Sequence, residues 1–371
     1  NDRPGAYVPR RPPPGSALRV RSFGRLQLQE FRDMLSVQTL AGVPLLGRAL
    51  AVQQQAIRAA WSEADAVLGD QAGIAPAFRV TLGALPAELL DLERNLFSTF
   101  FVAALQTLPV SPDRCRLYAV LNHLFRAWVT SADNLLDNED KSVFHFRMSN
   151  DSRIMPQIVT IMMADRVLHS VLDQAVEAGV LSRPEARSLS VHTLRILLPS
   201  GAEEAMEEDG FEDWSDPAYI LNELHPLKTG ILFQVPFLGP ELVETQLDAE
   251  RVAEMKAAMT SFGIGCQVLD DIRDMARDFL LRRANYVVAV AAARDGAASV
   301  RQRLAAGSSC EDSRVYQSFP EAVESGLDVA FQRIDGGLAR LDRCGMTGLV
   351  RAGPLIRGLL LRKLDLADLV R

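Results

Sequence analysis

The sequence has few of the residues that support small stapled or zinc-bound folds. Its 371 residues include only four cysteines and five histidines. The cysteines are widely spaced and form no Cys-x-x-Cys pair, so neither a disulfide framework nor a zinc site is indicated. Aromatic residues make up only 6% of the chain. Together with abundant Leu, Ala, Val and Arg, this favours helices over an all-β sandwich.

Long hydrophobic runs and an excess of positive charge are also missing. No uninterrupted apolar stretch reaches the roughly 18 residues of a membrane span. Asp and Glu number 47 against 40 Lys and Arg, for a formal net charge of −7, so a nucleic-acid partner is not expected. The basic N-terminal residues are not followed by the apolar segment of a signal peptide. We therefore expect a soluble cytoplasmic protein.

Lysine is scarce as well, because almost all of the basic residues are arginines. The chain contains only four lysines: Lys141, Lys228, Lys256 and Lys363. Each of them is therefore a candidate for a specific role.

The pattern of apolar residues predicts one helical domain. Residues 1–24 are rich in Pro, Gly and Arg and are expected to form an extended arm. Over residues 25–371, apolar side chains recur at spacings of three and four, and no Gly/Ser-rich linker interrupts them. Turn residues, among them Gly239-Pro240, are expected to separate the helices. The predicted helices are 26–36, 45–70, 84–107, 112–137, 152–178, 183–205, 216–228, 230–244, 247–277, 284–305, 311–340 and 346–370.

Two aspartates stand near the C-terminal end of the predicted helix 112–137. Asp133 and Asp137 are four residues apart and share one helical face. Two like charges there weaken the helix, and the negative end of the helix dipole adds to the cost. A bound divalent cation would reverse that cost. A solvated helix end is the simpler interpretation of this pair taken alone.

A second acidic cluster follows the apolar segment 261–266. Asp270, Asp274 and Asp278 share one face at four-residue spacing. Pairing with Arg273 and Arg277 within the helix is the alternative to metal binding. Mg²⁺ is commonly held by one or two carboxylates together with substrate phosphates. The two clusters could therefore hold two or three Mg²⁺ ions that bind a diphosphate, with Lys228 sharing the charge.

In order and spacing, these segments resemble the trans-isoprenyl diphosphate synthase branch of the class I isoprenoid synthase superfamily. Residues 133–137 resemble its first DDxxD motif, with Asn at the second place, and residues 267–274 resemble its second motif. Lys228-Thr229-Gly230 resembles its Lys-Thr element, and residues 161–168 resemble its Gly-Asp helix. Residues 283–286 resemble its late Gly-Lys-x-Thr-Tyr element.

The resemblance implies an all-α isoprenoid (terpenoid) synthase bundle around a central apolar cavity, with the two aspartate motifs facing each other at its mouth. The implied Mg²⁺ ligands are Asp133, Asp137, Asp270, Asp271 and Asp274. The implied diphosphate-binding residues are Lys228, Arg147, Arg283 and Arg94. The implied cavity residues are Phe97, Phe101, Phe125, Trp128, Val129, Thr229, Phe233 and Gln267. It also implies that Asp133, Asp137, Asp270, Asp274 and Lys228 carry the catalysis, and it is compatible with a homodimer.

Two departures from the pattern concern the second substrate of chain elongation. The Gly-Gly-Lys-Arg-x-Arg-Pro element of the family is replaced by residues 91–97, where only Arg94 is retained. The Arg-Arg-Gly after the first motif is reduced to Arg147 and its neighbours. A second diphosphate would therefore meet few cations. The expected activity is that of a terpene synthase (cyclase), which ionises a C10–C20 allylic prenyl diphosphate to a carbocation and releases pyrophosphate.

Two alternatives remain. The all-Asp second motif favours a prenyltransferase: an isoprenyl diphosphate synthase, a head-to-head synthase, or an enzyme that transfers to a non-diphosphate acceptor. A non-catalytic partner subunit is disfavoured, because clustered carboxylates without a cation only repel one another. The acidic run 203–209 is expected to be a solvated helix end, and His225 is expected to be structural.

Overall fold

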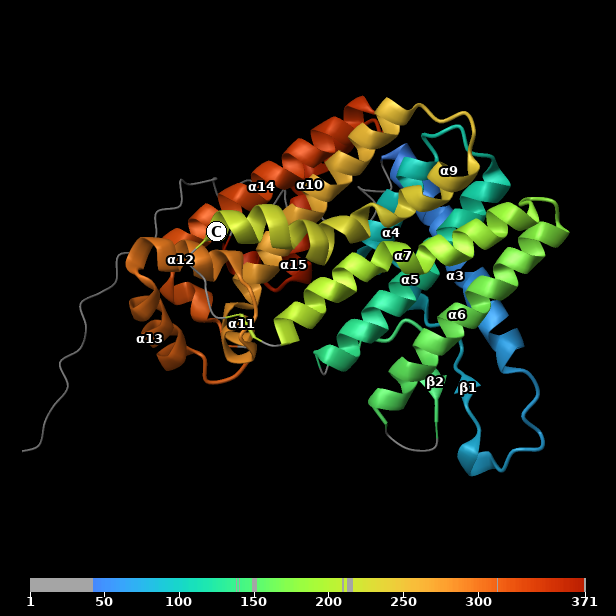
Figure 1. Cartoon of the computed structure of the whole chain (residues 1–371), viewed down its shortest axis with the longest axis horizontal. Helices are drawn as coiled ribbons and strands as arrows, with labels where there is room; N and C mark the ends of the chain where they lie inside the picture. The colour runs from blue at the N-terminus through green and yellow to red at the C-terminus, as the bar shows by residue number, and fades with distance from the viewer. Residues whose placement is uncertain are drawn as a thin grey trace, which may run out of the picture.

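The computed structural model describes residues 43–137, 139, 141–148, 152–208, 210–211, 216–311 and 313–369. Helices dominate this part of the chain (Figure 1). Its strands are the two-residue β1 (Thr81–Leu82) and β2 (Phe146–Arg147), which pair antiparallel. The predicted all-α class is confirmed. The arm at 1–24 and the predicted helix 26–36 lie outside the described residues.

The long helices follow the predicted ranges closely, because the apolar spacing and the caps agree. Ser111 and Asp248 cap two of them, accepting hydrogen bonds from the backbone N–H of Arg114 and Arg251. The helices are α3 Pro44–Leu68, α4 Leu92–Leu105, α5 Pro112–Leu136, α6 Ile154–Glu177, α7 Arg183–Glu208, α10 Ala249–Arg273, α11 Met275–Leu281, α12 Tyr286–Asp295, α13 Ala297–Gly307, α14 Pro320–Arg343 and α15 Leu349–Lys363. No helix in the described ranges is both long and apolar enough to cross a membrane.

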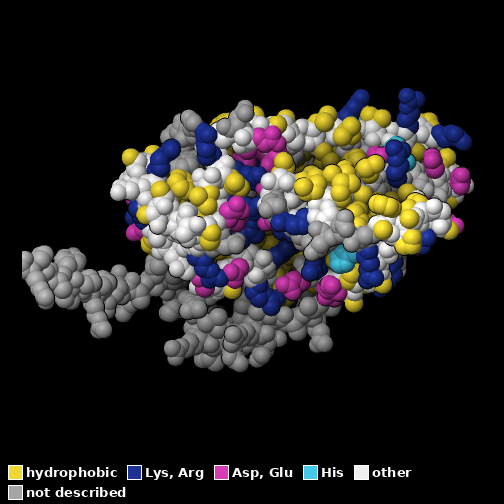
Figure 2. Space-filling view, turned by 90° about the horizontal axis from the view of Figure 1, so that it is seen from below, with side chains coloured by type: hydrophobic (Ala, Val, Ile, Leu, Met, Phe, Trp, Pro, Cys, Tyr) yellow, Lys and Arg dark blue, Asp and Glu magenta, His cyan; other side chains and the backbone are white. Residues whose placement is uncertain are grey.

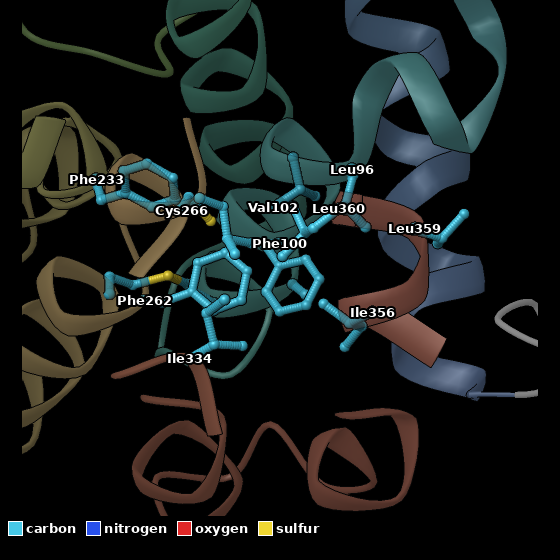
Figure 3. Close-up of a cluster of buried hydrophobic side chains, with 14 of the residues drawn as sticks. Leu96, Phe100, Val102, Phe233, Phe262, Cys266, Ile334, Ile356, Leu359 and Leu360 are labelled. Atoms are coloured by element: carbon cyan, nitrogen blue, oxygen red, sulfur yellow. The ribbon is translucent and has the colours of Figure 1, made fainter. Parts of the chain in front are cut away.

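The bundle is built on a close crossing of α10 and α14. A Cβ atom on Gly265 would lie 2.7 Å from the carbonyl oxygen of Ala330, and one on Gly337 would lie 2.8 Å from that of Ala258. Only glycine permits backbones to approach this closely. Beside the crossing, the rings of Phe100 and Phe262 stack at 5.4 Å, in the core that Figure 3 shows.

The segment 217–243 differs from the prediction of two helices. It is helical throughout, but irregular: α8 (Pro217–Tyr219) is followed by π turns at Ile220–Leu224 and Pro226–Gly230, 3-10 turns at Ile231–Phe233 and Val235–Phe237, and α9 (Leu238–Val243). The predicted break at Gly239-Pro240 is wrong, since both residues lie inside α9. Gly239 is needed there for packing, because a Cβ would lie 2.5 Å from the ring of Tyr118.

Acid should destabilise the fold through His123. This side chain is 3% exposed beside Phe144, and neither ring nitrogen has a hydrogen-bond partner in the described part. Burial lowers its pKa to about 3. In the unfolded chain His123 binds a proton below about pH 6.5, whereas in the folded chain it stays neutral down to about pH 3.

The free energy of unfolding should therefore fall as pH drops below about 6.5, by up to about 1.4 kcal/mol per pH unit from this residue. Urea unfolding between pH 5 and 7.5 should show a flatter pH dependence for His123→Leu than for the wild type. Parallel pH profiles would contradict this assignment.

Candidate active site

The two aspartate segments meet at one mouth of the bundle, where arginines connect them. Arg277 of α11 lies with Nη2 3.4 Å from Asp137 Oδ2 and Nη1 2.9 Å from Glu139 Oε1. Arg283 places Nη1 2.7 Å from Asp137 Oδ1 and Nη2 3.4 Å from Glu204 on α7. Acidic and basic side chains accordingly gather in a central band between hydrophobic areas (Figure 2).

Asp133 differs from the other mouth carboxylates. Its side chain reaches the surface but is partly surrounded by protein, and it has no ion pair within the described residues. Desolvation by the surrounding protein, followed by the charges of Asp137 and Glu204, raises its pKa to about 7. A carboxylate in such a field gains from any cation that binds beside it.

The second cluster is partly neutralised by its own arginine. Arg273 lies 3.0 Å from Asp270 Oδ1 and donates two hydrogen bonds to Asp274. Burial and Asp274 raise the pKa of Asp270 to about 6, against the opposing effect of Arg273. The helical pairing weighed for Asp270 and Arg273 is therefore present, whereas Arg277 turns towards α5.

Asp271 is placed differently from its predicted role as a metal ligand. It is 2% exposed and accepts hydrogen bonds from Gln267 Nε2 (3.0 Å) and the backbone N–H of Tyr286 (2.7 Å), and it lies 3.1 Å from His225 Nε2. Burial alone would raise its pKa, but His225 and these hydrogen bonds lower it. Buried in this way, Asp271 is not placed to bind a metal ion at the mouth, contrary to the role that the resemblance implied. Asp270 and Asp274 remain accessible there.

The irregular segment holds Lys228 at the acidic end of α7. Lys228 Nζ lies 2.7 Å from Glu207 Oε2. Although burial would lower the lysine's pKa, Glu207 and Asp278 raise it. The hydroxyl of Thr229, the next residue, donates to Gln267 on α10. Gln267 and Thr229, predicted as cavity residues, therefore tie the π turn to the second motif.

The acidic run 203–209 was expected to be a solvated helix end. That expectation is wrong for two of its residues, Glu203 and Glu207. Glu203 is 3% exposed with both carboxylate oxygens unpaired in the described part, and Glu207 is also buried. Burial and Glu207 raise the pKa of Glu203 to about 7. The sequence did contain a sign of this acidic cluster, because Glu203 and Glu207 are four residues apart, as Asp133 and Asp137 are. Asp209 lies outside the described residues, as do Asn138 and Asp140, which follow the first motif.

A second group of cations lies about two turns along α5 from Asp133, and two of its members, Arg94 and Lys363, are exposed. The resemblance implied a diphosphate-binding role only for Arg94. Arg126 stands two turns before Asp133 on the same face of α5 and donates to Asn95 Oδ1 at 2.8 Å. Burial and Arg94 lower the pKa of Arg126 to about 10, and burial and Arg126 lower that of Lys363 at the end of α15. None of the three has an ion pair within the described ranges. We call Arg94, Arg126 and Lys363 the cation group.

The predicted cavity residues divide into two sets. Phe97, Phe101 and Phe233 pack edge to face, with ring centroids 5.2 Å (Phe97 to Phe233) and 5.5 Å (Phe101 to Phe233) apart, and Lys363 Nζ lies 4.9 Å from the Phe97 ring centroid. Trp128 instead donates its indole N–H to the carbonyl of Ile161 on α6. The other residues predicted for this wall are Phe125, which is buried against Trp128, and Val129, which is half-buried.

Two predicted elements lie away from the acidic clusters. Arg147 is exposed on β2, and its side chain lies against Gly83 next to β1. Asp165, in the segment likened to the Gly-Asp helix, lies 3.8 Å from His169 on its own helix. The acidic group beside Lys228 comes instead from the end of α7, where Glu207 lies.

Comparisons with known proteins identify the fold. No family model matches the sequence, and no curated protein matches it. The chain is similar to a polyprenyl synthase from Caulobacter crescentus, solved with calcium and isoprenyl diphosphate, at TM-score 0.57 and 17% identity, covering 88% of this chain and 97% of that one.

Two further structures are similar. One is a decaprenyl diphosphate synthase from Rhodobacter capsulatus (TM-score 0.55, 12% identity, 87% of this chain and 99% of that one). The other is a geranylgeranyl pyrophosphate synthase from Lactobacillus brevis (TM-score 0.55, 16% identity, 91% and 100%). The likeness confirms that the chain has the all-α isoprenoid synthase fold.

Removing charge at Asp133 and at Asp271 should have opposite effects on stability. Asp271→Asn should lower the free energy of unfolding by about 3 kcal/mol, because it leaves a buried imidazole and amide without their anion. Asp133→Asn should raise the unfolding midpoint above about pH 7, where the folded-state carboxyl is ionised, and have no effect near pH 2.5, where the carboxyl is protonated in both states. Urea unfolding at both pH values measures this. A loss of stability in both variants at pH 8 would show that Asp133 is not strained by its neighbours.

Proposed function

We propose that the chain is a prenyltransferase, which ionises an allylic prenyl diphosphate at the mouth and joins the prenyl group to a second substrate that carries a diphosphate. The cation group supports this choice over the cyclase. The cyclase was favoured because few cations seemed available for a second diphosphate, and Arg126 and Lys363 supply them from α5 and α15. A cyclase would leave this group without a use.

The electrostatics of the cation group call for an anion. Three like charges close together repel one another, and this repulsion adds to desolvation in lowering the pKa values of Arg126 and Lys363. A diphosphate would replace that repulsion by charge-assisted hydrogen bonds. Arg126 stands about 10 Å along α5 from Asp133, given a rise of about 1.5 Å per residue. Two diphosphates could therefore lie side by side, with their prenyl chains meeting between them.

In the proposed reaction, the C–O bond of the allylic diphosphate breaks and pyrophosphate leaves with the electron pair. The double bond of the second substrate attacks the allylic cation, and the adduct loses a proton. Lys228, Arg273 and Arg283 would bind the leaving group. The Phe97 and Phe233 rings would exclude water and face the cation. Mg²⁺, when bound, stabilises the leaving group as a Lewis acid, and Asp133 and Asp270 would hold it.

The test uses geranyl, farnesyl and geranylgeranyl diphosphate with Mg²⁺, each alone and with isopentenyl diphosphate. Pyrophosphate release should require both substrates. Arg126→Gln and Lys363→Gln should each raise KM for isopentenyl diphosphate about tenfold, since a lost charge-assisted hydrogen bond costs about 1.5–3 kcal/mol. Lys256→Gln, which removes a lysine paired with exposed Glu241, is the matched control.

Release from an allylic diphosphate alone, with hydrocarbon products, would instead establish the cyclase. No turnover with any substrate would favour the partner subunit.

We also propose that two copies pair through α7. The outward face of this helix carries Val191, Leu194 and Leu198 and then small residues that include Ala202 and Ala205. A two-fold axis at Leu198 places Leu194 opposite Ala202 of the partner subunit and Val191 opposite Ala205 of the partner subunit. Large residues thus meet small ones, as a self-complementary interface requires.

Sedimentation should therefore detect a dimer that Leu194→Glu converts to a monomer. Val350→Glu, at an exposed apolar position on α15, should leave the dimer intact. Leu198→Cys should form an intersubunit disulfide, because this residue meets its own copy at the axis. A monomeric wild type would refute the pairing.

A further inference from the structure

We infer that Arg277 and Arg283 take, at Asp137, the place that a divalent ion would occupy, so that this site works with fewer metal ions than its two aspartate clusters suggest. The inference rests on the proposed function only for the identity of the ligand. Its basis is the set of contacts around Asp137, which leave neither carboxylate oxygen facing open space.

Each oxygen of Asp137 faces a different guanidinium. Oδ1 lies 2.7 Å from Arg283 Nη1, and Oδ2 lies 3.4 Å from Arg277 Nη2. Arg277 is itself buried, and it is held further by the carbonyl oxygen of Asp137 (2.9 Å), by Glu139 (2.9 Å) and by Glu311 (3.5 Å). A Mg²⁺ ligand must bring an oxygen to about 2.1 Å from the ion. Asp137 could do so only by giving up the arginine at the oxygen that binds the ion.

The backbone explains how these arginines reach α5. Helix α10 ends at Arg273, and Asp274, at φ −93° and ψ 11°, breaks the chain direction before α11 begins. Arg277 therefore points to α5 rather than to Asp274. Arg282, in the left-handed conformation at φ 57°, ends α11 and brings Arg283 back to the same carboxylate. Two separate turns thus converge on one aspartate.

The second cluster shows the same replacement more weakly, since Arg273 contacts both Asp270 and Asp274. Among the four aspartates at the mouth, Asp133 is the one without an ion pair in the described part. No group of three acidic, His or Cys side chains in those ranges converges as metal ligands do. The full metal set implied by the resemblance therefore does not fit these residues, whereas one ion at Asp133 does.

Guanidinium groups can serve a diphosphate in place of an ion. Their planar forks bind phosphate oxygens in pairs, and their charge is permanent at any working pH. Arg277 and Arg283 lie at the mouth beside Lys228's acidic partners, so they can bind Asp137 and the leaving group together.

The test counts ions directly and needs no turnover. Mn²⁺ is titrated into the full-length protein with inorganic pyrophosphate present, and free Mn²⁺ is followed by electron paramagnetic resonance. We expect one Mn²⁺ per chain, lost in Asp133→Asn and retained in Asp137→Asn. The double variant Arg277→Gln/Arg283→Gln should bind at least one further ion, because it frees Asp137 and Glu139.

Arg340→Gln is the matched control. It removes a guanidinium of equal charge from its pair with Glu254, near the opposite end of α10, and should leave the count unchanged. In a titration without pyrophosphate, Arg277→Gln alone should tighten Mn²⁺ binding about tenfold, which keeps the test valid if the double variant does not fold. An arginine that serves only the diphosphate would leave the affinity for the metal alone unchanged.

Two or three ions in the wild type, with fewer in Asp137→Asn, would overturn the inference. So would a double variant that folds and binds no additional ion. A protein inactive towards every prenyl diphosphate that still binds one Mn²⁺ in this way would contradict the proposed function and support this inference.

Discussion

The site depends on a single electrostatic conflict. Helices α5, α7 and α10 all bring their C-terminal ends to the same mouth, and each of those ends carries acidic side chains. Helix C-termini already present partial negative charge, so acids there are destabilising. The arginines and lysines around the mouth compensate for that charge. The acidic helix ends therefore form a cluster whose mutual repulsion is relieved by any cation that lies beside it.

The same conflict explains which parts of the site could be predicted from the sequence. Asp133, Asp137, Asp270 and Asp274 were identified because each pair has helical spacing at a helix end. The positions of Arg277 and Lys363 were not predicted. Arg277 reaches Asp137 because the chain breaks at Asp274, and Lys363 reaches Phe97 from the end of α15. Each contact joins residues more than 100 positions apart in the sequence. The resemblance alone implied Asp271 as a metal ligand, and its burial against His225 depends on tertiary contacts that no local pattern reveals.

The fold itself was more predictable than the site. Three- and four-residue spacing sets each helix independently of its partners, whereas breaks depend on packing. Gly239 looks like a turn in the sequence but lies within a helix, because the Tyr118 ring occupies the space of its missing side chain. Gly296, at φ 83°, does divide a predicted helix into α12 and α13. Whether a glycine ends a helix or allows close packing is decided by its neighbours in space.

The glycines at the crossing of α10 and α14 have a consequence for motion. The backbones of α10 and α14 touch at Gly265 and at Gly337, so a shift of one helix along the other would bring backbone atoms into collision. These contacts hold α10 in place. The chain beyond Asp274 is a seven-residue helix, α11, fastened to α5 chiefly by side-chain charges. Met275 and Ala276 at the start of α11 are fully buried, so this helix is anchored in the core as well. Ligand binding can therefore exchange the ion pairs of Arg277 by moving side chains, while the helices around the mouth keep their places.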